Sequence, residues 1–389
     1  MTYAAALPIL QKEWGMSAAA GGSISSGFQI GYAVSLVVFS SFADIVGPRS
    51  LYLGSMSGGA ILSLTFALFA RDYLSGLILY TLVGISLGGT YTTGVMILAD
   101  QYPIQRRGMA IGFFIASTSL GYALSLIISG IAFPIGGYKL SFLLTCLGPI
   151  VGAILAWMAL IRTKVSVVKR QKQQRFIKEV IGNRSAMLLI GGYSFHSWEL
   201  LGMWAWTPAF LASCLLFSGA EGLKAAGMGS YLSALFHVIG LIASFSMGIL
   251  SDSLGRARVI LMLSGLSAAC SFMFGWSIGQ PLILIVMIGL VYAFSALGDS
   301  PVLSAALTEV VKTSYIGAAF GLRSLLGFGA GAISPFVFGI ILDWTNPIAS
   351  GMGYKSWGWA YSILGLGGLG AVTMAYIFGM IQTKIKSKS

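Results

Sequence analysis

Residues 248–258 of this chain read GILSDSLGRAR, and residues 40–49 read SSFADIVGPR. Each stretch follows an apolar segment and places an Asp three residues before a Gly, with an Arg one or two positions later. The two Asp–Gly pairs lie 208 residues apart. Three further matches lie 209 residues apart: Asp100 with Glu309, Gly108 with Gly317, and Gly112 with Gly321. Repetition at a nearly constant offset indicates a duplicated structural unit.

The repeated units consist almost entirely of apolar segments. Hydrophobic residues make up 57% and charged residues 9% of the 389 residues, and the mean hydropathy is +0.88. A lipid core of roughly 30 Å requires about 20 consecutive apolar residues per helix. Eleven segments meet this requirement, near 21–42, 51–70, 74–99, 109–132, 140–161, 185–217, 228–250, 259–279, 281–307, 318–342 and 359–381. The sequence therefore predicts an all-α polytopic membrane protein, because charge this scarce cannot solvate a globular surface of this size.

The basic residues predict the orientation in the membrane. Residues 162–184 carry eight Lys and Arg against one acid, Glu179. With this segment in the cytoplasm and the spans alternating, seventeen of the 23 Lys and Arg fall on the cytoplasmic side and five on the other. The basic residues behind the net charge of +12 are therefore expected to orient the chain and to contact anionic lipid. This explanation of the charge argues against nucleic-acid binding.

The basic segment also divides the chain into domains. We expect an N-terminal bundle over 1–161, a cytoplasmic linker over 162–184 and a C-terminal bundle over 185–389, arranged as parallel six-helix repeats. Residues 1–8 are too short to span a bilayer, although the helix that contains the matching Pro208 begins near Ser185. Most of the first helix is therefore expected to be missing, through a misassigned start, a shortened chain or a natural form with eleven full helices.

The repeated loops resemble the signature of the major facilitator superfamily, in which D-x-x-G and basic residues follow the second helix of each half. GILSDSLGRAR is the better match, whereas SSFADIVGPR lacks the leading Gly and carries Pro48 in place of a basic residue. The resemblance covers essentially the whole chain and implies alternating access by rocking of two bundles. It assigns a cytoplasmic gate, which locks the halves, to Asp44, Gly47, Arg49, Asp252, Gly255 and Arg256. The alternative is a simple solvated turn.

Departures from the family pattern indicate which members of the superfamily the chain resembles. Tyr80 stands four residues before Gly84, where many proton-coupled members carry Arg. Residues 117–130 contain no Pro where many antiporters are rich in Gly and Pro, which disfavours a drug/proton exporter. The runs at 91–94, 107–112 and 196–199 look most like bacterial uptake-type members near the nitrate and cyanate permease groups.

Glu199 is the strongest functional candidate because it lies near the middle of the 185–217 segment. An ionisable group at that depth is costly unless it is paired, hydrated or neutral, so it indicates a function by default. We expect Glu199 to carry protons, with His196 one helical turn before it. The alternative is a protonated Glu199 that forms a structural hydrogen bond between helices.

Asp299 and Arg323 form a second candidate site. Asp299 lies ten residues before Glu309, about 15 Å deep, and Arg323 lies a few residues into the next span. An ion pair between them is expected, acting as a gate that breaks during transport or as a permanent bridge. A third interpretation makes Arg323 the counter-ion of an anionic substrate.

Aromatic and polar residues on neighbouring segments complete the prediction. Trp198, Trp204, Trp206 and Tyr193 surround Glu199 in sequence, and they either line a substrate site or form a lipid-facing belt. Further candidates are Tyr91, Gln29, Tyr32, Thr92 and His237. Cys146, Cys214 and Cys270 are expected to be packing residues. No metal site, no cofactor and no enzymatic residue set is predicted.

The favoured function is a secondary active transporter that moves a small solute, a small anion with protons, by alternating access. It is expected to act as a monomer in a bacterial inner membrane, with lipids as its other partners. One alternative is a facilitator or exporter of amphiphilic compounds. Another is a non-transporting membrane sensor or assembly factor.

Overall fold

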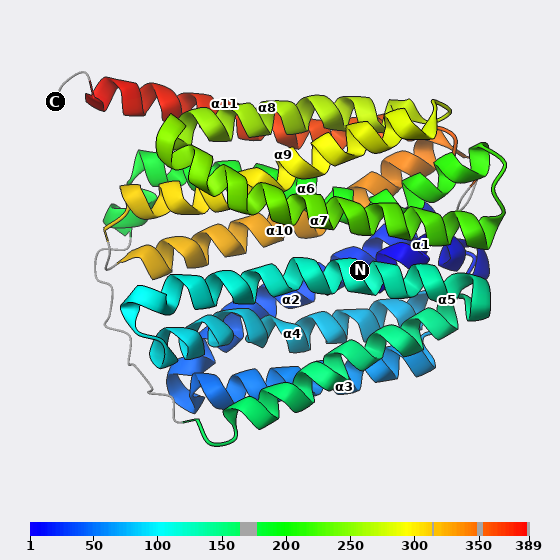
Figure 1. The fold of residues 1–389 in the computed structure, drawn as a ribbon, viewed down its shortest axis with the longest axis horizontal. Helices are drawn as coiled ribbons and strands as arrows, with labels where there is room; N and C mark the ends of the chain where they lie inside the picture. Colours follow the sequence, from blue (N-terminus) through cyan, green and yellow to red (C-terminus); the bar gives the residue numbers. More distant parts are fainter. Residues whose placement is uncertain (164–176, 313–314, 348–352, 387–389) are drawn as a thin grey trace.

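The computed structural model describes residues 1–163, 177–312, 315–347 and 353–386, and these residues form helices and no strand (Figure 1). The long helices are α1 (Thr2–Glu13), α2 (Ala18–Val46), α3 (Pro48–Phe69), α4 (Tyr73–Gln101), α5 (Ile104–Leu160), α6 (Arg184–Phe217), α7 (Gly222–Leu254), α8 (Arg256–Phe274), α9 (Leu282–Val310), α10 (Ile316–Thr345) and α11 (Gly358–Lys386). Short helical turns lie at Ile177–Ile181 and Gly275–Ser277. The prediction of an all-α membrane protein is confirmed.

Ten of the described helices are long and apolar enough to cross a membrane. One of them, α5, holds two of the predicted spans. Its helical geometry breaks at Gly136 and Gly137, where Gly137 has a φ of 62°, and Figure 1 shows the helix folding back on itself there. The predicted segments 109–132 and 140–161 therefore form the two arms of a hairpin.

The duplicated loops adopt the same backbone conformation. Gly47, between α2 and α3, has φ and ψ of 93° and 139°, and Gly255, between α7 and α8, has 90° and 140°. A positive φ favours glycine, which explains why both loops carry Gly at this position. The sequence repeat therefore corresponds to a structural one.

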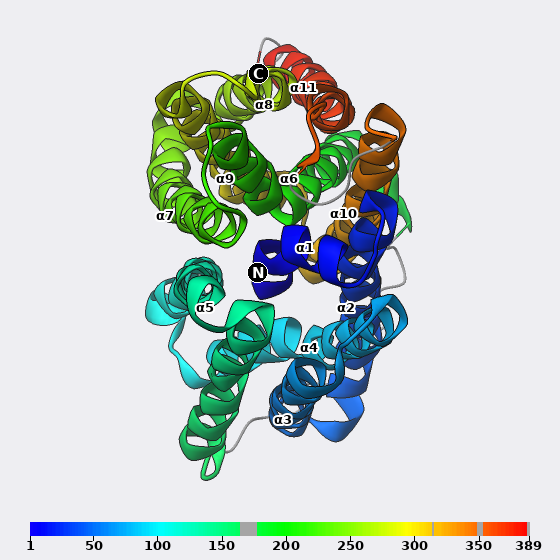
Figure 2. The ribbon, with the colours of Figure 1, turned by 90° about the vertical axis from the view of Figure 1, so that its right-hand side faces the viewer.

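The helices gather into two groups. Figure 2 shows α6–α11 in one group and α2–α5 in the other, with α1 between them. The predicted division at 161 and 185 follows this grouping and remains a prediction, because residues 164–176 of the linker lie outside the described residues. Helix α1 has twelve residues, about 18 Å of helix, and it contacts α2, α5, α6 and α7.

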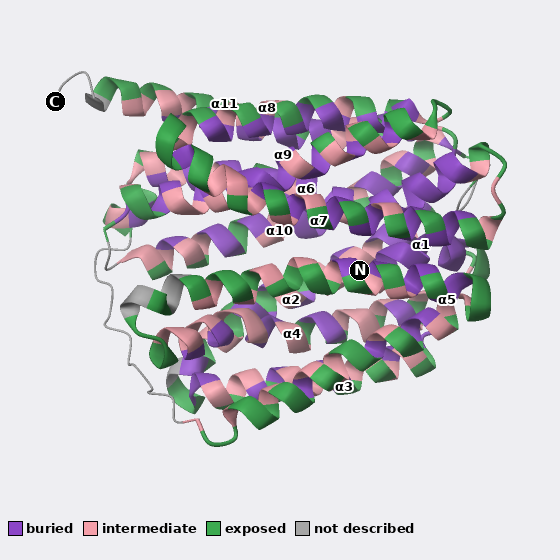
Figure 3. Ribbon diagram, viewed as in Figure 1, coloured by how far each residue is buried: buried purple, intermediate pink, exposed green. Residues whose placement is uncertain are grey.

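Burial distinguishes the inner helices from the outer ones. We compare the most apolar 18-residue stretch of each helix. In α6, 83% of this stretch is buried, against 28% in α3 and 11% in α5. Figure 3 shows exposed residues along the outer helices and buried residues through α6. Many exposed side chains are large and apolar, such as Phe113, Met158 and Ile283. A helix that exposes this much apolar surface faces lipid rather than water.

The two groups of helices touch closely at the end of the molecule where α2 begins, which we call the far end. The opposite end, which holds the α2–α3 and α7–α8 loops, is called the linker end. A Cβ added to Gly22 of α2 would lie 2.2 Å from the carbonyl oxygen of Pro335 in α10. One added to Gly227 of α7 would lie 2.9 Å from that of Gly130 in α5. The pairs α2–α10 and α5–α7 are thus in backbone contact at the far end.

The same helices diverge toward the linker end. Gly112 of α5, Gly248 of α7 and Gly317 of α10 have no heavy atom of another element within 4 Å of an added Cβ, as far as the described residues go. A shallow, wide-open depression of about 610 Å³ lies along the linker end of α7, and only α7 residues line it: Ser246, Ile249, Leu250, Asp252 and Ser253. The protein is therefore closed at the far end and open at the linker end, which the charge distribution predicts to be cytoplasmic.

Candidate functional site

Arg323 of α10 is a buried cation whose hydrogen-bonding capacity is only partly used. Only 6% of the residue is exposed. Its Nη1 donates to Ser304 Oγ of α9 at 2.5 Å. The guanidinium carbon lies 4.1 Å from the ring centroid of Tyr193 in α6 and 4.4 Å from that of Phe320. The Nε–H has no partner in the part of the chain that the structure describes. Three helices therefore hold a cation that retains free donors.

Tyr193 connects Arg323 to a second polar pair. Its ring centroid lies 5.4 Å from that of His196, one turn later in α6. His196 Nδ1 lies 2.8 Å from Asp299 Oδ1 of α9, and both side chains are almost fully buried. The expected ion pair between Asp299 and Arg323 is therefore not present in this conformation, because the carboxylate faces His196 and the guanidinium faces Ser304 and two rings.

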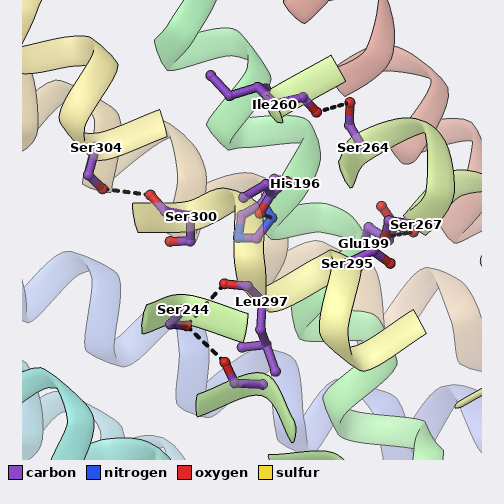
Figure 4. Close-up of polar contacts among 12 residues, drawn as sticks. His196, Glu199, Ser244, Ile260, Ser264, Ser267, Ser295, Leu297, Ser300 and Ser304 are labelled. Atoms are coloured by element: carbon purple, nitrogen blue, oxygen red, sulfur yellow. Dashed lines mark hydrogen bonds and ion pairs between the residues drawn. The ribbon is translucent and has the colours of Figure 1, made fainter. Parts of the chain in front are cut away.

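Glu199 lies in a separate polar cluster inside the α6–α11 group. Its Oε1 accepts a hydrogen bond of 2.9 Å from Ser267 Oγ of α8, and its Oε2 is 2.9 Å from the position of a Cβ added to Gly368 of α11. Tyr292 of α9 is the next member of the cluster and donates to Ser271 at 3.0 Å. Figure 4 shows Glu199 beside Ser267, with His196 on the same helix. Glu199 is 3% exposed and is held among helices of one group.

The candidate residues of the α2–α5 group differ in their contacts. Tyr91 of α4 is half-buried, and its ring centroid lies 6.4 Å from that of Phe114 in α5. Tyr32 of α2 contacts Phe328 of α10 in an edge-to-face arrangement, with ring centroids 5.6 Å apart. Gln29 is half-buried, one turn before Tyr32 in α2, and Thr92 is half-buried next to Tyr91. The two groups of helices therefore meet through an aromatic contact on α10, the helix that carries Arg323.

The tryptophans near Glu199 have three different environments. The Trp198 indole donates to the carbonyl oxygen of Ile363 in α11 at 3.1 Å, which directs it toward an outer helix. Trp206 is fully buried and donates to the Pro335 carbonyl at 3.0 Å. The lipid-facing interpretation is therefore wrong for Trp206, and Trp198 packs α6 against α11 instead of facing the α2–α5 group.

Trp204 and His237 form an aromatic cluster with the other half. Their ring centroids are 5.3 Å apart, and each lies 5.3–5.4 Å from the ring of Tyr122 in α5. Trp204 Nε1 and His237 Nδ1 have no hydrogen-bond partner among the described residues. This cluster lies between Arg323 and the closed far end of α6.

The two arginines of the predicted gate contact residues of their own halves. Arg49 donates to the carbonyl oxygens of Leu160 and Ile161 at the end of α5, at 2.7 Å each. Arg256 pairs with Asp252 at 2.5 Å and with Glu309 at 2.9 Å. The side chain of Asp44 lies outside the described part of the structure. As far as the described side chains go, Arg49 and Arg256 thus form no contact between the halves in this open conformation.

Several contributors to these clusters carry no sequence signal. Ser304, Phe320, Ser267 and Tyr292 are ordinary residues of membrane helices, where Ser and aromatic side chains are common. Their role follows from their contacts with charged residues in the folded protein. The sequence pattern alone does not predict those contacts.

Within the described ranges, no three His, Cys, Asp or Glu side chains gather in a way that would hold a metal ion. Cys146, Cys214 and Cys270 are free and buried. Their environment matches the packing role expected from the sequence.

The family description "Major Facilitator Superfamily" matches residues 1–335. The chain belongs to the major facilitator superfamily. It is therefore a membrane transporter of that family rather than an enzyme, as the sequence predicts. The fold agrees with a crystal structure of the nucleoside transporter NupG, at a TM-score of 0.71 and 15% identity, over 97% of this chain and 94% of that one.

Two relatives within the superfamily are described as transporters of organic anions. A gallate transporter from Pseudomonas putida is 30% identical over 164 residues, which is 42% of this chain and 36% of the relative. A probable sulfoacetate transporter from Cupriavidus necator is 25% identical over 373 residues, which covers 88% of this chain and 83% of the relative. Neither is a nitrate or cyanate permease, and that finer resemblance remains a prediction.

Proposed function

We propose that this superfamily member takes up a small organic anion together with protons, through a site centred on Arg323. The observation that carries the proposal is a cation, 6% exposed, whose Nε–H has no partner within the described residues. A buried charge without a full set of partners is costly, so it is expected where a ligand completes its shell. The gallate and sulfoacetate relatives support an organic anion as that ligand.

We assign proton coupling to three titratable residues close to this site, His196, Asp299 and Glu199. His196 and Asp299 lie one aromatic ring away from Arg323, since Tyr193 contacts both Arg323 and His196. Glu199 lies one turn further along α6 in its Ser267 cluster. A proton taken up with the anion balances charge inside the membrane, where each unpaired charge is costly. We propose Asp299 with His196 as the group close to substrate and Glu199 as a second proton carrier.

Alternating access between the two halves provides the transport step. The conformation described is open at the linker end, so the substrate is released to the cytoplasm if that end lies inside. Asp252, Gly255 and Arg256, with Gly47 and Arg49, are proposed to stiffen the linker end of each half and to meet the other half when it closes. We propose a monomer in a bacterial inner membrane.

The alternative within transport is a facilitator or exporter of amphiphilic compounds. Such a protein would not need a partly free cation close to buried acidic residues.

The test is accumulation of radiolabelled gallate or sulfoacetate in vesicles that contain the purified protein, with and without an inward proton gradient. We expect accumulation above equilibrium only with the gradient, and its loss in Arg323→Ala. Equilibration that ignores the gradient would favour the facilitator, and binding without uptake would contradict the proposal. Arg258→Ala, which changes a cation of the α7–α8 loop region, serves as the matched control.

A further inference from the structure

The donors of Arg323 are distributed unevenly around its guanidinium. A guanidinium carries five N–H groups in one plane. Nη1 is used by Ser304, Nε is buried and unpartnered, and Nη2 makes no hydrogen bond with the described residues. The Nε–Nη2 edge therefore presents two parallel donors that the protein leaves free. That edge is the one that matches a carboxylate with two in-line hydrogen bonds.

The surroundings of the guanidinium hold this edge in place. Tyr193 and Phe320 flank the cation at 4.1 and 4.4 Å from their ring centroids. Ser304 donates its own hydroxyl proton to the carbonyl oxygen of Ser300 at 2.8 Å, as Figure 4 shows. Its oxygen lone pairs are therefore directed toward Nη1 of Arg323. With Nη1 and two aromatic contacts fixed, less side-chain entropy is lost when a ligand binds to the remaining edge.

An acidic residue of this protein does not occupy the free edge. Asp299 is directed to His196 at 2.8 Å, and Glu199 is directed to Ser267 at 2.9 Å. No ion pair within 4 Å of Arg323 is formed by the described acidic residues. The described acidic residues therefore leave this edge unpaired, and a ligand anion can occupy it.

We infer that the Nε–Nη2 edge of Arg323 binds one carboxylate of the substrate in a bidentate pair, and that Tyr193 and Phe320 make the site selective for planar carboxylates over tetrahedral oxyanions. The inference rests on the proposed function and adds the atoms and the head group that it recognises. A carboxylate places both oxygens in the guanidinium plane. A sulfonate or phosphonate projects a third oxygen out of that plane, on the side of the flanking rings, whose electron-rich faces repel an anionic oxygen.

The experiment compares ligands that share one scaffold and differ in head group: benzoate, benzenesulfonate, phenylphosphonate and benzamide. Binding to the purified full-length protein is measured as the ligand concentration that gives half-maximal thermal stabilisation. Each ligand is titrated against the natural chain and against three variants, Arg323→Lys, Phe320→Leu and Ser304→Ala. The exposed Arg258→Lys exchange serves as the matched control for the loss of a guanidinium elsewhere.

We expect the natural chain and Arg258→Lys to bind benzoate about tenfold more tightly than benzenesulfonate, the factor that about 1.4 kcal/mol represents. Arg323→Lys should retain weak anion binding and lose this preference, because an ammonium is a point charge without a planar edge. Phe320→Leu and Ser304→Ala keep the guanidinium and should reduce the preference several-fold. They keep the test informative if Arg323→Lys fails to fold.

Two other results would contradict the inference, and they differ in whether the proposed function also fails. Equal binding of benzoate and benzenesulfonate, or a preference that survives in all three variants, would overturn the planar-carboxylate site and leave anion transport standing. Absence of binding by all three anions, in a protein that melts cooperatively, would overturn the proposed function as well.

Discussion

Tyr193 touches both parts of the proposed transport chemistry. Its ring contacts the Arg323 guanidinium on one side and the His196 imidazole on another. Substrate bound at Arg323 would thus lie one aromatic side chain away from the Asp299–His196 pair. A displacement of Tyr193 on substrate binding gives a direct physical route from anion occupancy to that pair.

Glu199→Gln tests whether titration of Glu199 is required for coupled transport. The variant keeps the size of the side chain and its hydrogen bond with Ser267. We expect gradient-driven accumulation to be lost while exchange of substrate across the membrane continues. The measurement is uptake into vesicles with an imposed pH gradient, beside counterflow without one. Glu221→Gln, an exposed acid in the α6–α7 turn, is the control, and natural accumulation in Glu199→Gln would remove Glu199 from the mechanism.

His196 and Asp299 should be energetically coupled, whereas Asp299 and Arg323 should not be. Removing one partner of a close buried pair leaves the other polar group buried and uncompensated, at a cost of about 1–3 kcal/mol. We therefore expect Asp299→Asn with His196→Phe to be less destabilising together than the sum of the single changes. Thermal unfolding of both double-mutant cycles supplies the data. Additive losses for His196 and Asp299 would contradict the pairing at 2.8 Å.

At the scale of elements, the far end is closed by one helix capping another across the halves. The carboxylate of Asp343, near the end of α10, accepts hydrogen bonds from the backbone N–H groups of Ala18 and Ala19 at 2.7 and 2.8 Å. These are among the first N–H groups of α2, which have no partner within their own helix. A negative charge there also interacts favourably with the helix dipole. This contact must break if the far end opens.

Gly339→Ala should weaken closure of the far end. A Cβ at Gly339 would lie 2.3 Å from the carbonyl oxygen of Ala18, whereas Gly329, on the same helix, has open space at that position. The expected cost of the clash is about 1–3 kcal/mol. A cysteine introduced near Ala18 should react faster with a membrane-impermeant thiol reagent in Gly339→Ala than in the natural chain. Gly329→Ala should leave the rate unchanged, and equal rates in all three would show that this crossing does not close the far end.

The elements were predictable because their signals are local and repeated. Eleven apolar stretches of bilayer length and two Asp–Gly loops at one offset predict the helices, the hairpin arms of α5 and the duplicated turns. The contacts of the site were less predictable, since the helices are apolar on most faces and the pattern does not set their rotation. The positions of Asp299 and Arg323 along their helices predicted that the two residues lie at similar depths in the membrane. The rotation of α9 about its own axis, which the sequence does not predict, directs Asp299 to His196.

The same reason explains the tryptophans. Trp198 and Trp206 belong to one helix and lie eight residues apart, yet the first bonds to α11 and the second to α10. Sequence spacing alone allowed both a substrate site and a lipid-facing belt for these residues. The neighbours of α6 decide between them.

At the scale of the whole molecule, Arg323 lies where the two halves diverge. The halves are in backbone contact at the far end, and aromatic contacts such as that of Tyr32 with Phe328 continue between the halves further along. A solute entering from the open linker end would thus meet Arg323 before the closed layer around Trp204 and His237. Reorientation of the halves would then expose the same side chain to the opposite face.

The central claim, coupled movement of an organic anion and a proton through the Arg323 site, is tested most directly by substrate-induced proton flux. Gallate is added to lightly buffered vesicles that contain the protein, and the external pH is recorded together with gallate uptake. We predict that external alkalinisation accompanies uptake in the natural chain and that Arg323→Ala abolishes both signals. Gallate uptake without any change in external pH, or uptake and alkalinisation that persist in Arg323→Ala, would contradict the claim.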